Sequence, residues 1–236
     1  MNLSLVIPCY NEAKNLPLLL PRCAELTAAV SGAEVILVDN GSCDETPEVL
    51  AELLSQFPGC RSVRVEVNQG YGFGILSGLA AATGDILSWT HADMQTNPSD
   101  VAKGFALFAE APQPENLFVK GRRYGRPLAD VIFTHGMSLF ETLLLSHALF
   151  DINAQPTMFH RAFFKTWQRP PHDFSLDLFA YYSAKRAGLA LRRFPVQFGA
   201  RAHGASHWNV NWRGKLKFIR RTLDYSFRLR RELSNL

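Results

Sequence analysis

The segment Gly84–Pro98 reads GDILSWTHADMQTNP. Its apolar part, Ile86–Trp89, is typical of a buried strand, and polar side chains follow at alternate positions: His91, Asp93 and Gln95. Alternate residues of an extended chain point the same way, so these three could face one point at the strand's carboxyl end. Such ligands suit Mg²⁺ or Mn²⁺ held partly by phosphates. The alternative is a polar turn that only ends the strand.

The rest of the chain alternates strand-like and helix-like segments. Strands are expected at residues 3–7, 34–38, 61–67 and 117–120, and helices at residues 16–30, 47–57, 75–82 and 98–110. Strands that alternate with helices imply right-handed crossovers and a mostly parallel sheet. The sequence therefore predicts an α/β fold with a central sheet flanked by helices.

Composition indicates one large globular domain. The chain has 236 residues, of which 47% are hydrophobic and 19% are charged. Polar residues such as Asp130 and Glu141 interrupt the most apolar region, Leu128–Phe150, so no membrane-spanning segment is expected. The amino-terminal residues lack a basic region and a cleavage site, and the four cysteines lack metal or disulfide spacing. These features favour a cytoplasmic location.

A glycine-dense loop, Asn68–Gly74, raises the question of dinucleotide binding. Its spacing is G-x-G-x-x-x-G, and it follows the third expected strand instead of the first. Both features differ from the Rossmann fingerprint. The sequence also contains no phosphate-binding P-loop, no G-x-S-x-G nucleophile motif and no H-E-x-x-H zinc motif.

Six segments in order resemble family 2 glycosyltransferases of the GT-A fold. They are VIPCYNEAKNL, VDNGSCDET, NQGYGFGILSGLAAATGDIL, HADMQTNP, KGRRY and RAHGASH, which together extend over roughly residues 3–210. Within that family the segments are most similar to dolichyl-phosphate mannose synthase and bacterial polyprenyl-phosphate glycosyltransferases. The resemblance implies a GT-A catalytic domain at residues 1–210.

The resemblance also implies a set of nucleotide-binding residues. They are Pro8, Tyr10, Glu12, Asp39, Gly70, Ala92 and Asp93. Asp39 would accept the hydrogen of the base's imide, and Gly70 would let the backbone approach the nucleotide closely. The donor would be a GDP- or UDP-hexose. Asn40 stands where the family usually has a second aspartate, which removes one expected carboxylate.

The metal-binding motif departs from the family at His91, where a D-x-D pattern is usual. Mn²⁺ accepts imidazole more readily than Mg²⁺ does. Asp93 is expected to be the essential ligand with Gln95, and His91 either joins them or orients a water or a phosphate. Catalysis would further need positive charge on the leaving diphosphate, for which Arg123 and Arg201 are the candidates.

The acceptor is the least determined part of the reaction. A polyprenyl phosphate needs no protein base, because its second pKa is near 6. A saccharide hydroxyl would need one, and Asp151, Asp173 and Asp177 are available. Asp177 could instead hold sugar hydroxyls or be an ordinary exposed helix residue, and Ser206 and His207 are expected at the diphosphate or acceptor. A binding-only relative without catalysis is a third reading.

Basic residues gather near the carboxyl terminus. Residues 213–232 contain eight basic and two acidic residues, with apolar residues Leu216, Ile219, Leu223 and Phe227 at helical spacing. Residues 211–236 are therefore expected to form a basic amphipathic helix, either packed on the domain or on the inner face of a membrane. A nucleic-acid partner is not expected. Leu128–Phe150 is either a second interfacial helix or a core helix, and a membrane-protein partner or a homo-oligomer stays open.

Overall fold

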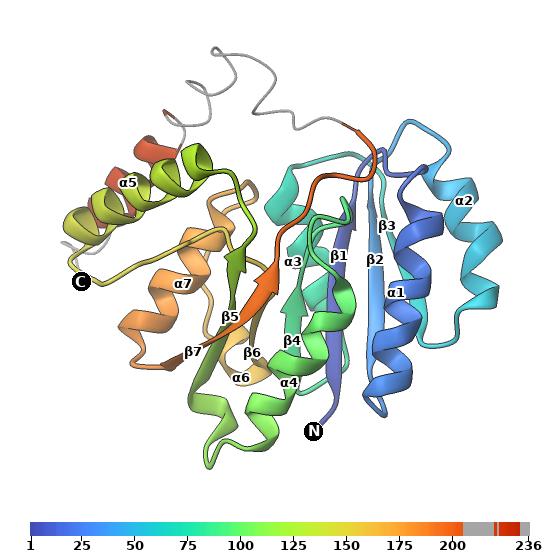
Figure 1. Ribbon diagram of the computed structural model, residues 1–236, viewed down its shortest axis with the longest axis horizontal. Coiled ribbons are helices and arrows are strands. Elements are labelled where there is room, and N and C mark those ends of the chain that lie inside the picture. Colours follow the sequence, from blue (N-terminus) through green and yellow to red (C-terminus); the bar gives the residue numbers. More distant parts are fainter. Residues whose placement is uncertain (205–219, 221, 232–236) are drawn as a thin grey trace.

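The structure is a computed structural model that describes residues 1–204, 220 and 222–231 (Figure 1). In this part of the chain, seven strands form one sheet in the order β3-β2-β1-β4-β6-β5-β7. The strands are β1 (Leu3–Cys9), β2 (Glu34–Asn40), β3 (Cys60–Val65), β4 (Ile86–Trp89), β5 (Leu117–Tyr124), β6 (Thr157–His160) and β7 (Ala190–Gln197). Only β6 runs antiparallel to its neighbours, β4 and β5. The expected α/β fold with a mostly parallel sheet is confirmed.

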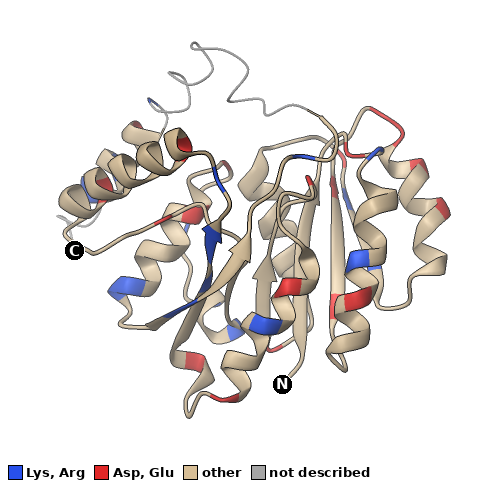
Figure 2. Ribbon diagram, viewed as in Figure 1, with Lys and Arg blue, Asp and Glu red and all other residues tan. Residues whose placement is uncertain are grey.

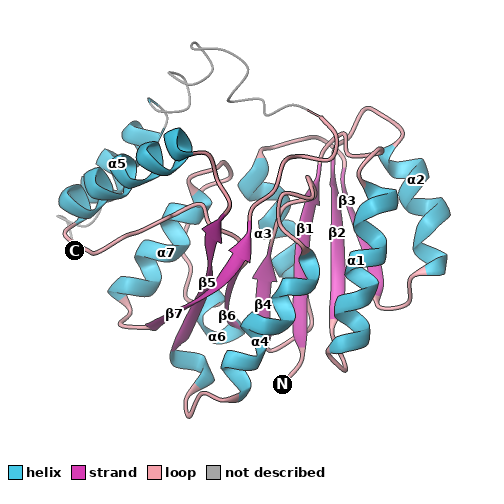
Figure 3. Ribbon diagram, viewed as in Figure 1, coloured by secondary structure: helices cyan, strands magenta, loops and turns pink. Residues whose placement is uncertain are grey.

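Helices cover both faces of the sheet (Figure 3). They are α1 (Leu16–Ala29), α2 (Thr46–Leu53), α3 (Tyr71–Ala81), α4 (Val101–Ala109), α5 (Leu128–Leu145), α6 (Arg161–Phe164) and α7 (Leu176–Arg186). Short 3₁₀ turns occupy Leu54–Gln56, Pro98–Asp100 and Pro114–Asn116. Residues 222–231 are helical as well.

The two faces of the sheet form two separate apolar cores. Val6, Ile36 and Val38 pack with α3 and α7 on one face, whereas Leu5 and Ile7 pack with α1 and α4 on the other. Successive side chains of a strand point to opposite faces, and here both faces are covered by helices. The strands therefore read as continuous apolar runs in the sequence.

Helix α3 begins at Tyr71, four residues earlier than the glycine-dense loop suggests. Gly72 and Gly74 consequently lie inside the helix. A Cβ atom on Gly72 would lie 2.6 Å from the carbonyl oxygen of Pro171, and one on Gly78 would lie 2.3 Å from Val6 Cγ1. These glycines serve close packing of α3 against the sheet and a neighbouring loop.

Helix α5 stands apart from the sheet and is mostly exposed, with few charged residues along it (Figure 2). Within the described residues it is the one helix long and apolar enough to cross a membrane by length and composition, with a mean hydropathy of 1.3. Asp130 and Glu141 still interrupt this helix, so the expectation that it does not span a membrane stays a prediction. Residues 222–231 pack beside it, since the hydroxyl of Ser226 lies 2.7 Å from Glu141 Oε1.

Candidate active site

Asp39 lies near the carboxyl end of β2, between β3 and β1, and is buried. Its Oδ1 accepts a hydrogen bond from the backbone N–H of Ser42 at 3.0 Å. Its Oδ2 lies 3.4 Å from Arg64 Nη1, an ion pair that is too long for a good hydrogen bond, and has no hydrogen-bond partner among the described residues. A buried, unsatisfied carboxylate oxygen is costly, so it is ready to accept a hydrogen bond from a ligand.

The neighbouring Asn40 holds the loop that precedes α3. Its amide Nδ2 donates to the carbonyl oxygen of Gly70 at 3.0 Å. Gly70 has a positive φ of 111°, and a Cβ atom there would lie 2.5 Å from the carbonyl oxygen of His172. An aspartate at position 40 could not donate this bond, because a carboxylate only accepts. The departure from the family pattern therefore has a structural function in this chain.

Glu12 follows β1 and lies near Asp93 and Arg201. The hydroxyl of Thr46 accepts a hydrogen bond from the backbone N–H of Glu12 at 2.8 Å. Burial raises the pKa of Glu12; the hydrogen bond from Asn15 and the charge of Arg201 lower it, and Asp93 raises it further. The net shift is upward. The loops after β1 and β4 thus bring two carboxylates together with the guanidinium of Arg201, which comes from the segment after β7.

Tyr10 and Pro8 accompany Glu12 at this end of the sheet. Pro8 pairs with Val38 across the β1–β2 ladder, and the partly exposed Tyr10 places its hydroxyl 3.9 Å from the Sγ atom of Cys43. Two of the candidate base-pocket segments, after β1 and after β2, therefore touch. The residues expected around the base are brought together by adjacent parallel strands.

Asp93 lies in the loop after β4 and is buried. Its Oδ1 accepts a hydrogen bond from the backbone N–H of Gln95 at 3.1 Å, and its Oδ2 forms an ion pair with Arg201 Nη2 at 2.9 Å. The segment that carries Arg201 is tied to the same loop, because the N–H of Gly199 donates to the carbonyl of Gln95 at 2.8 Å. Residues 199–202 therefore lie over the candidate metal ligand.

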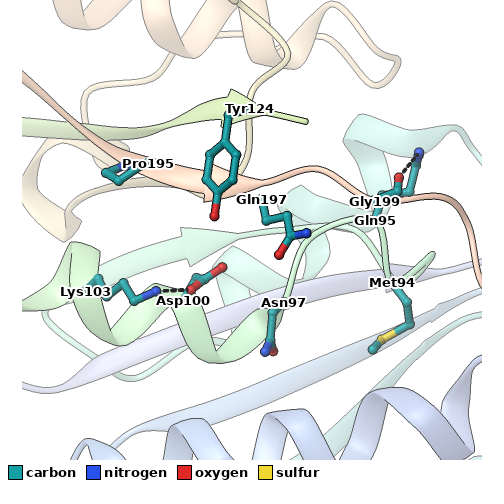
Figure 4. A pocket seen from close by; sticks show the side chains of 9 residues that line it. All are labelled: Met94, Gln95, Asn97, Asp100, Lys103, Tyr124, Pro195, Gln197 and Gly199. Carbon is teal, nitrogen blue, oxygen red and sulfur yellow. Dashed lines mark hydrogen bonds and ion pairs between the residues drawn. The ribbon is translucent and has the colours of Figure 1, made fainter. Parts of the chain in front are cut away.

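The extended geometry assumed for His91, Asp93 and Gln95 is wrong. The chain bends through residues 92–96, and Met94 has a positive φ of 61°. The side-chain amide of Gln95 consequently donates to the carbonyl oxygen of Gly199 at 3.1 Å (Figure 4). The ring of His91 stacks on the ring of Tyr71, with 5.4 Å between the ring centres. Because the chain bends here, alternate residues no longer point the same way, and the side chains of His91 and Gln95 turn to different neighbours.

A divalent cation fits this site only in part. Within the described ranges, no three His, Cys, Asp or Glu side chains are grouped to hold a metal ion. Asp93 is a suitable hard ligand, but Arg201 occupies one of its oxygens. A cation at Asp93 would need oxygens from a ligand's phosphates, as Mg²⁺ and Mn²⁺ commonly do.

Arg123 lies near the end of β5 and pairs with Asp151. Its Nε donates to Asp151 Oδ1 at 3.0 Å, and its guanidinium lies 5.1 Å from the centre of the Phe198 ring. Burial opposes ionisation of Asp151, but the hydrogen bond and charge of Arg123, with Arg126 and Arg193, lower its pKa overall. Arg123 is thus held rigidly by a carboxylate and an aromatic ring.

Asp177 is only 2% exposed, so it is not an ordinary surface residue of α7. Trp89 Nε1 and Gln155 Nε2 both donate to its Oδ1, at 3.2 Å and 2.6 Å. The Gln155 amide also lies 3.5 Å from the hydroxyl of Tyr71. Asp177 therefore anchors a buried polar network beneath the His91–Tyr71 stack.

Sequence reasoning missed four members of this region: Tyr71, Trp89, Lys120 and Gln155. Lys120 is fully buried, donates to the Thr157 hydroxyl at 2.6 Å, and has a pKa lowered by burial to about 7. A lysine inside the apolar run LFVK was the available signal, because lysine is seldom buried without a function for its charge. Ser206 and His207 lie outside the described residues.

A family model described as "Glycosyl transferase family 2" matches residues 4–169, which is more than half of the chain.

Curated relatives share only part of this region. An undecaprenyl-phosphate 4-deoxy-4-formamido-L-arabinose transferase of Sodalis glossinidius (strain morsitans) is 38% identical over 106 residues, covering 42% of this chain and 31% of the relative. The enzyme of the same name from Pectobacterium carotovorum subsp. carotovorum (strain PC1) is 36% identical over 105 residues, covering 43% and 32%. The chain thus matches about a third of the length of these relatives.

Solved structures are similar over most of the chain. A mannosyltransferase from Pyrobaculum calidifontis in complex with GDP-Man and Mn²⁺ has a TM-score of 0.64 at 20% identity, covering 86% of this chain and 58% of the other. Glucosyl-3-phosphoglycerate synthase from Mycobacterium tuberculosis, in complex with Mn²⁺, UDP and phosphoglyceric acid, has a TM-score of 0.69 at 20% identity, covering 97% and 78%. At this identity the likeness concerns the fold.

Proposed function

The chain belongs to glycosyl transferase family 2 and has the GT-A fold, and on that premise we propose that it transfers a sugar from a nucleotide diphosphate donor to a polyprenyl phosphate. The domain that does so is residues 1–210, with residues 211–236 as a basic amphipathic extension. The observation that carries the proposal is that Asp39, Glu12 and Asp93 lie at the ends of the adjacent strands β2, β1 and β4, and that Arg201, from the segment after β7, pairs with Asp93 in a chain with this family membership.

The donor's base would bind at Asp39. Its buried Oδ2 needs a hydrogen-bond donor, and the imide N–H of uracil or the N–H of guanine supplies one. Pro8 and Tyr10 would line the same pocket, and Gly70, with no side chain of its own, would let the backbone approach the nucleotide closely. The solved neighbours include complexes with GDP-Man and with UDP, and a hexose is proposed by analogy with them.

Asp93 would hold the diphosphate through Mn²⁺ or Mg²⁺, with Gln95 and His91 as further candidate ligands. A bound cation would neutralise charge on the leaving diphosphate. Binding of a cation at Asp93 would displace Arg201, whose guanidinium would then be available to pair with phosphate oxygens. Arg123, Ser206 and His207 are proposed to contact phosphate groups on the donor or the acceptor.

A phosphate acceptor agrees better with the carboxylates of this chain than a sugar hydroxyl does. A hydroxyl acceptor needs a free general base. Asp151 is paired with Arg123, Asp177 accepts two hydrogen bonds inside the protein, and Asp173 Oδ1 accepts one from the N–H of Ser175 at 2.9 Å. An ionised phosphate attacks without such a base. Direct attack opposite the leaving diphosphate would invert the anomeric configuration.

We place the enzyme at the cytoplasmic face of a membrane. Leu128, Ile132, Leu139 and Leu143 are exposed along one stripe of α5. Arg220, Arg228, Arg230 and Arg231 are exposed on the adjacent carboxyl-terminal helix. An apolar stripe beside basic residues is typical of a helix that lies on anionic lipid. This surface would bring the soluble donor and the lipid acceptor to the same side.

Vesicle flotation tests the membrane surface. The variant Leu143→Glu should lose most of its binding to vesicles that contain phosphatidylglycerol, because a charge would have to enter the acyl boundary. Leu18→Glu, at an exposed leucine of α1, is the matched control and should bind normally. Equal flotation of both variants would exclude α5 as the contact.

The transfer reaction is tested with labelled GDP- and UDP-hexoses and membrane lipid extract. Label should enter a lipid product that mild acid cleaves, and only when Mn²⁺ or Mg²⁺ is present. Asp93→Ala should reduce the rate by about 100-fold or more. Asp85→Ala, which alters an exposed carboxylate at the opposite end of β4, should not.

The alternatives give different results in the same assay. Label found only in water-soluble glycan would identify a saccharide acceptor and refute the lipid proposal. Nucleotide binding without any turnover would identify a non-catalytic relative. The anomeric configuration of a lipid product, measured by NMR, would decide between inversion and retention.

A further inference from the structure

A pocket of about 280 Å³ lies between the amino end of α4 and the ends of β5 and β7 (Figure 4). Its polar lining residues are Gln95, Asn97, Asp100, Lys103, Tyr124 and Gln197. Apart from Gln95, none of the proposed donor or metal residues lines it. Gln95 is thus the one residue that the pocket shares with the proposed donor and metal residues, and the proposed reaction uses no other part of its lining.

The charges in this pocket cancel. Lys103 Nζ lies 2.6 Å from Asp100 Oδ1, and this carboxylate raises the pKa of the lysine. No other charged side chain lines the pocket. A phosphate or a nucleotide would find no uncompensated cation there, since the only ammonium already has its counter-charge. The lining favours an uncharged ligand.

The amide side chains of the pocket can both donate and accept hydrogen bonds. Asn97 Oδ1 accepts from the N–H of Ser99, which leaves its Nδ2 to donate. Gln95 Nε2 donates to the Gly199 carbonyl, which leaves its Oε1 to accept. Gln197 is exposed, and its side chain makes no hydrogen bond to the described residues, so both ends of its side-chain amide are available. Ligand hydroxyls both donate and accept, and therefore match this set.

Tyr124 adds the aromatic surface. Tyr124 is 54% exposed, and its side chain points toward the same space as that of Gln197, which comes from a different strand (Figure 4). A tyrosine offers an apolar ring face together with a polar hydroxyl. Such a face suits the C–H side of a pyranose ring, while the amides bind its hydroxyls.

We propose that this pocket binds one neutral sugar unit, at a position separate from the donor sugar. The volume is near the lower limit of ordinary ligand pockets, about 300 Å³, which suits a single ring and not a nucleotide sugar. The proposal rests on the shape and chemistry of the pocket. It stands independently of whether the chain transfers sugar to a lipid.

The pocket shares a wall with the candidate active site. Gln95 lines it and donates its backbone N–H to Asp93, and Gly199 lines it and belongs to the segment that carries Arg201. A sugar in the pocket thus contacts the two segments that carry the Asp93–Arg201 ion pair. Occupancy should change the NMR signals of those segments as well as those of the pocket.

The test is a titration of the ¹⁵N-labelled full chain with methyl α-mannoside and methyl β-glucoside, followed by amide NMR. Shift changes should centre on residues 94–97, 124 and 197–199. Tyr124→Ala and Gln197→Ala should each raise the dissociation constant by about fivefold or more, as expected for the loss of one contact. Gln56→Ala, at an exposed glutamine far from the pocket, should leave it unchanged.

Three results would overturn the proposal. The first is no shift change with either neutral sugar. The second is a set of changes around Asp39 and Gly70 that UDP competes away, because the sugar would then occupy the donor cleft. The third is tighter binding of glucose 6-phosphate at the pocket than of the neutral sugars, which would make it a phosphate site. The amide spectra of the variants also report whether each variant is folded.

Discussion

Replacing Glu141 with glutamine should stabilise the protein at alkaline pH and have little effect at acidic pH. Glu141 is fully buried on α5, and its Oε2 has no hydrogen-bond partner among the described residues. Burial raises its pKa from 4.5 to about 7, against the smaller lowering by Ser226. The hydroxyl of Ser226 lies 2.7 Å from Glu141 Oε1 and 2.8 Å from the Thr222 carbonyl, and its single hydrogen can serve only one of them. When Glu141 is protonated, its own hydrogen can bond to the Ser226 oxygen, and the Ser226 hydroxyl can then donate to the Thr222 carbonyl.

The direction of this pH dependence follows from the linkage between proton binding and folding. Because the folded pKa exceeds the unfolded one, the folded protein holds the extra proton, and this stabilisation is complete below about pH 4.5 and lost as pH rises through about 7. At about 1.4 kcal/mol per pKa unit, the loss is on the order of 3 kcal/mol. Local relaxation reduces this, so about 2 kcal/mol is expected. Glutamine has the same shape and carries no charge at either pH.

Urea unfolding followed by tryptophan fluorescence measures the effect. At each pH, the free energy of unfolding of the unmodified protein is subtracted from that of Glu141→Gln. This difference should rise by about 2 kcal/mol between pH 5 and pH 8.5. Glu52→Gln, at an exposed position of α2, is the control and should show no such rise. A difference that is independent of pH, or that falls as pH rises, would refute the account of Glu141 as a neutral buried carboxyl.

Two further predictions concern packing and acid stability. Gly78→Ala should lower the free energy of unfolding by about 1–3 kcal/mol, because its Cβ would lie 2.3 Å from Val6 Cγ1. Gly136→Ala, in open space on α5, should raise it by about 0.5–1 kcal/mol, and denaturant titration of both variants checks this contrast. Glu34 is partly buried, which opposes ionisation, but hydrogen bonds from Ser4, Thr83 and Arg61 lower its pKa to about 2. Glu34→Gln should destabilise the protein by about 1–2 kcal/mol at pH 7, and the difference should shrink as pH falls from about 4.5 towards 2; a constant difference would contradict the assignment.

The family and the fold were predictable because their signals are local. Each strand read as an apolar run that ended at polar residues, and the order of the motifs indicated family 2 glycosyltransferases, which the family model confirms. The buried position of Asp39 at a strand end also follows from this pattern. The expectation of a cation at Asp93, with the roles of the individual site residues, stays a prediction.

Contacts between distant segments could not be predicted in the same way. Nothing near Asp177 indicates that Trp89 and Gln155 will bury it, and nothing near Asp93 indicates that Arg201 will occupy its Oδ2. The glycines of Asn68–Gly74 read as a loop, but some belong to a helix that lies against His172.

The amino-acid sequence alone thus determined the alternation of strands and helices, the apolar faces and the end of the sheet where the polar residues gather. These depend on the period of a strand or helix and on burial, which a few neighbouring residues specify. Only the tertiary structure decided which charges meet, which carboxyl has its pKa raised and where a second pocket opens. Those outcomes depend on pairs of groups far apart in the chain, and their energies exist only once folding has removed water between them.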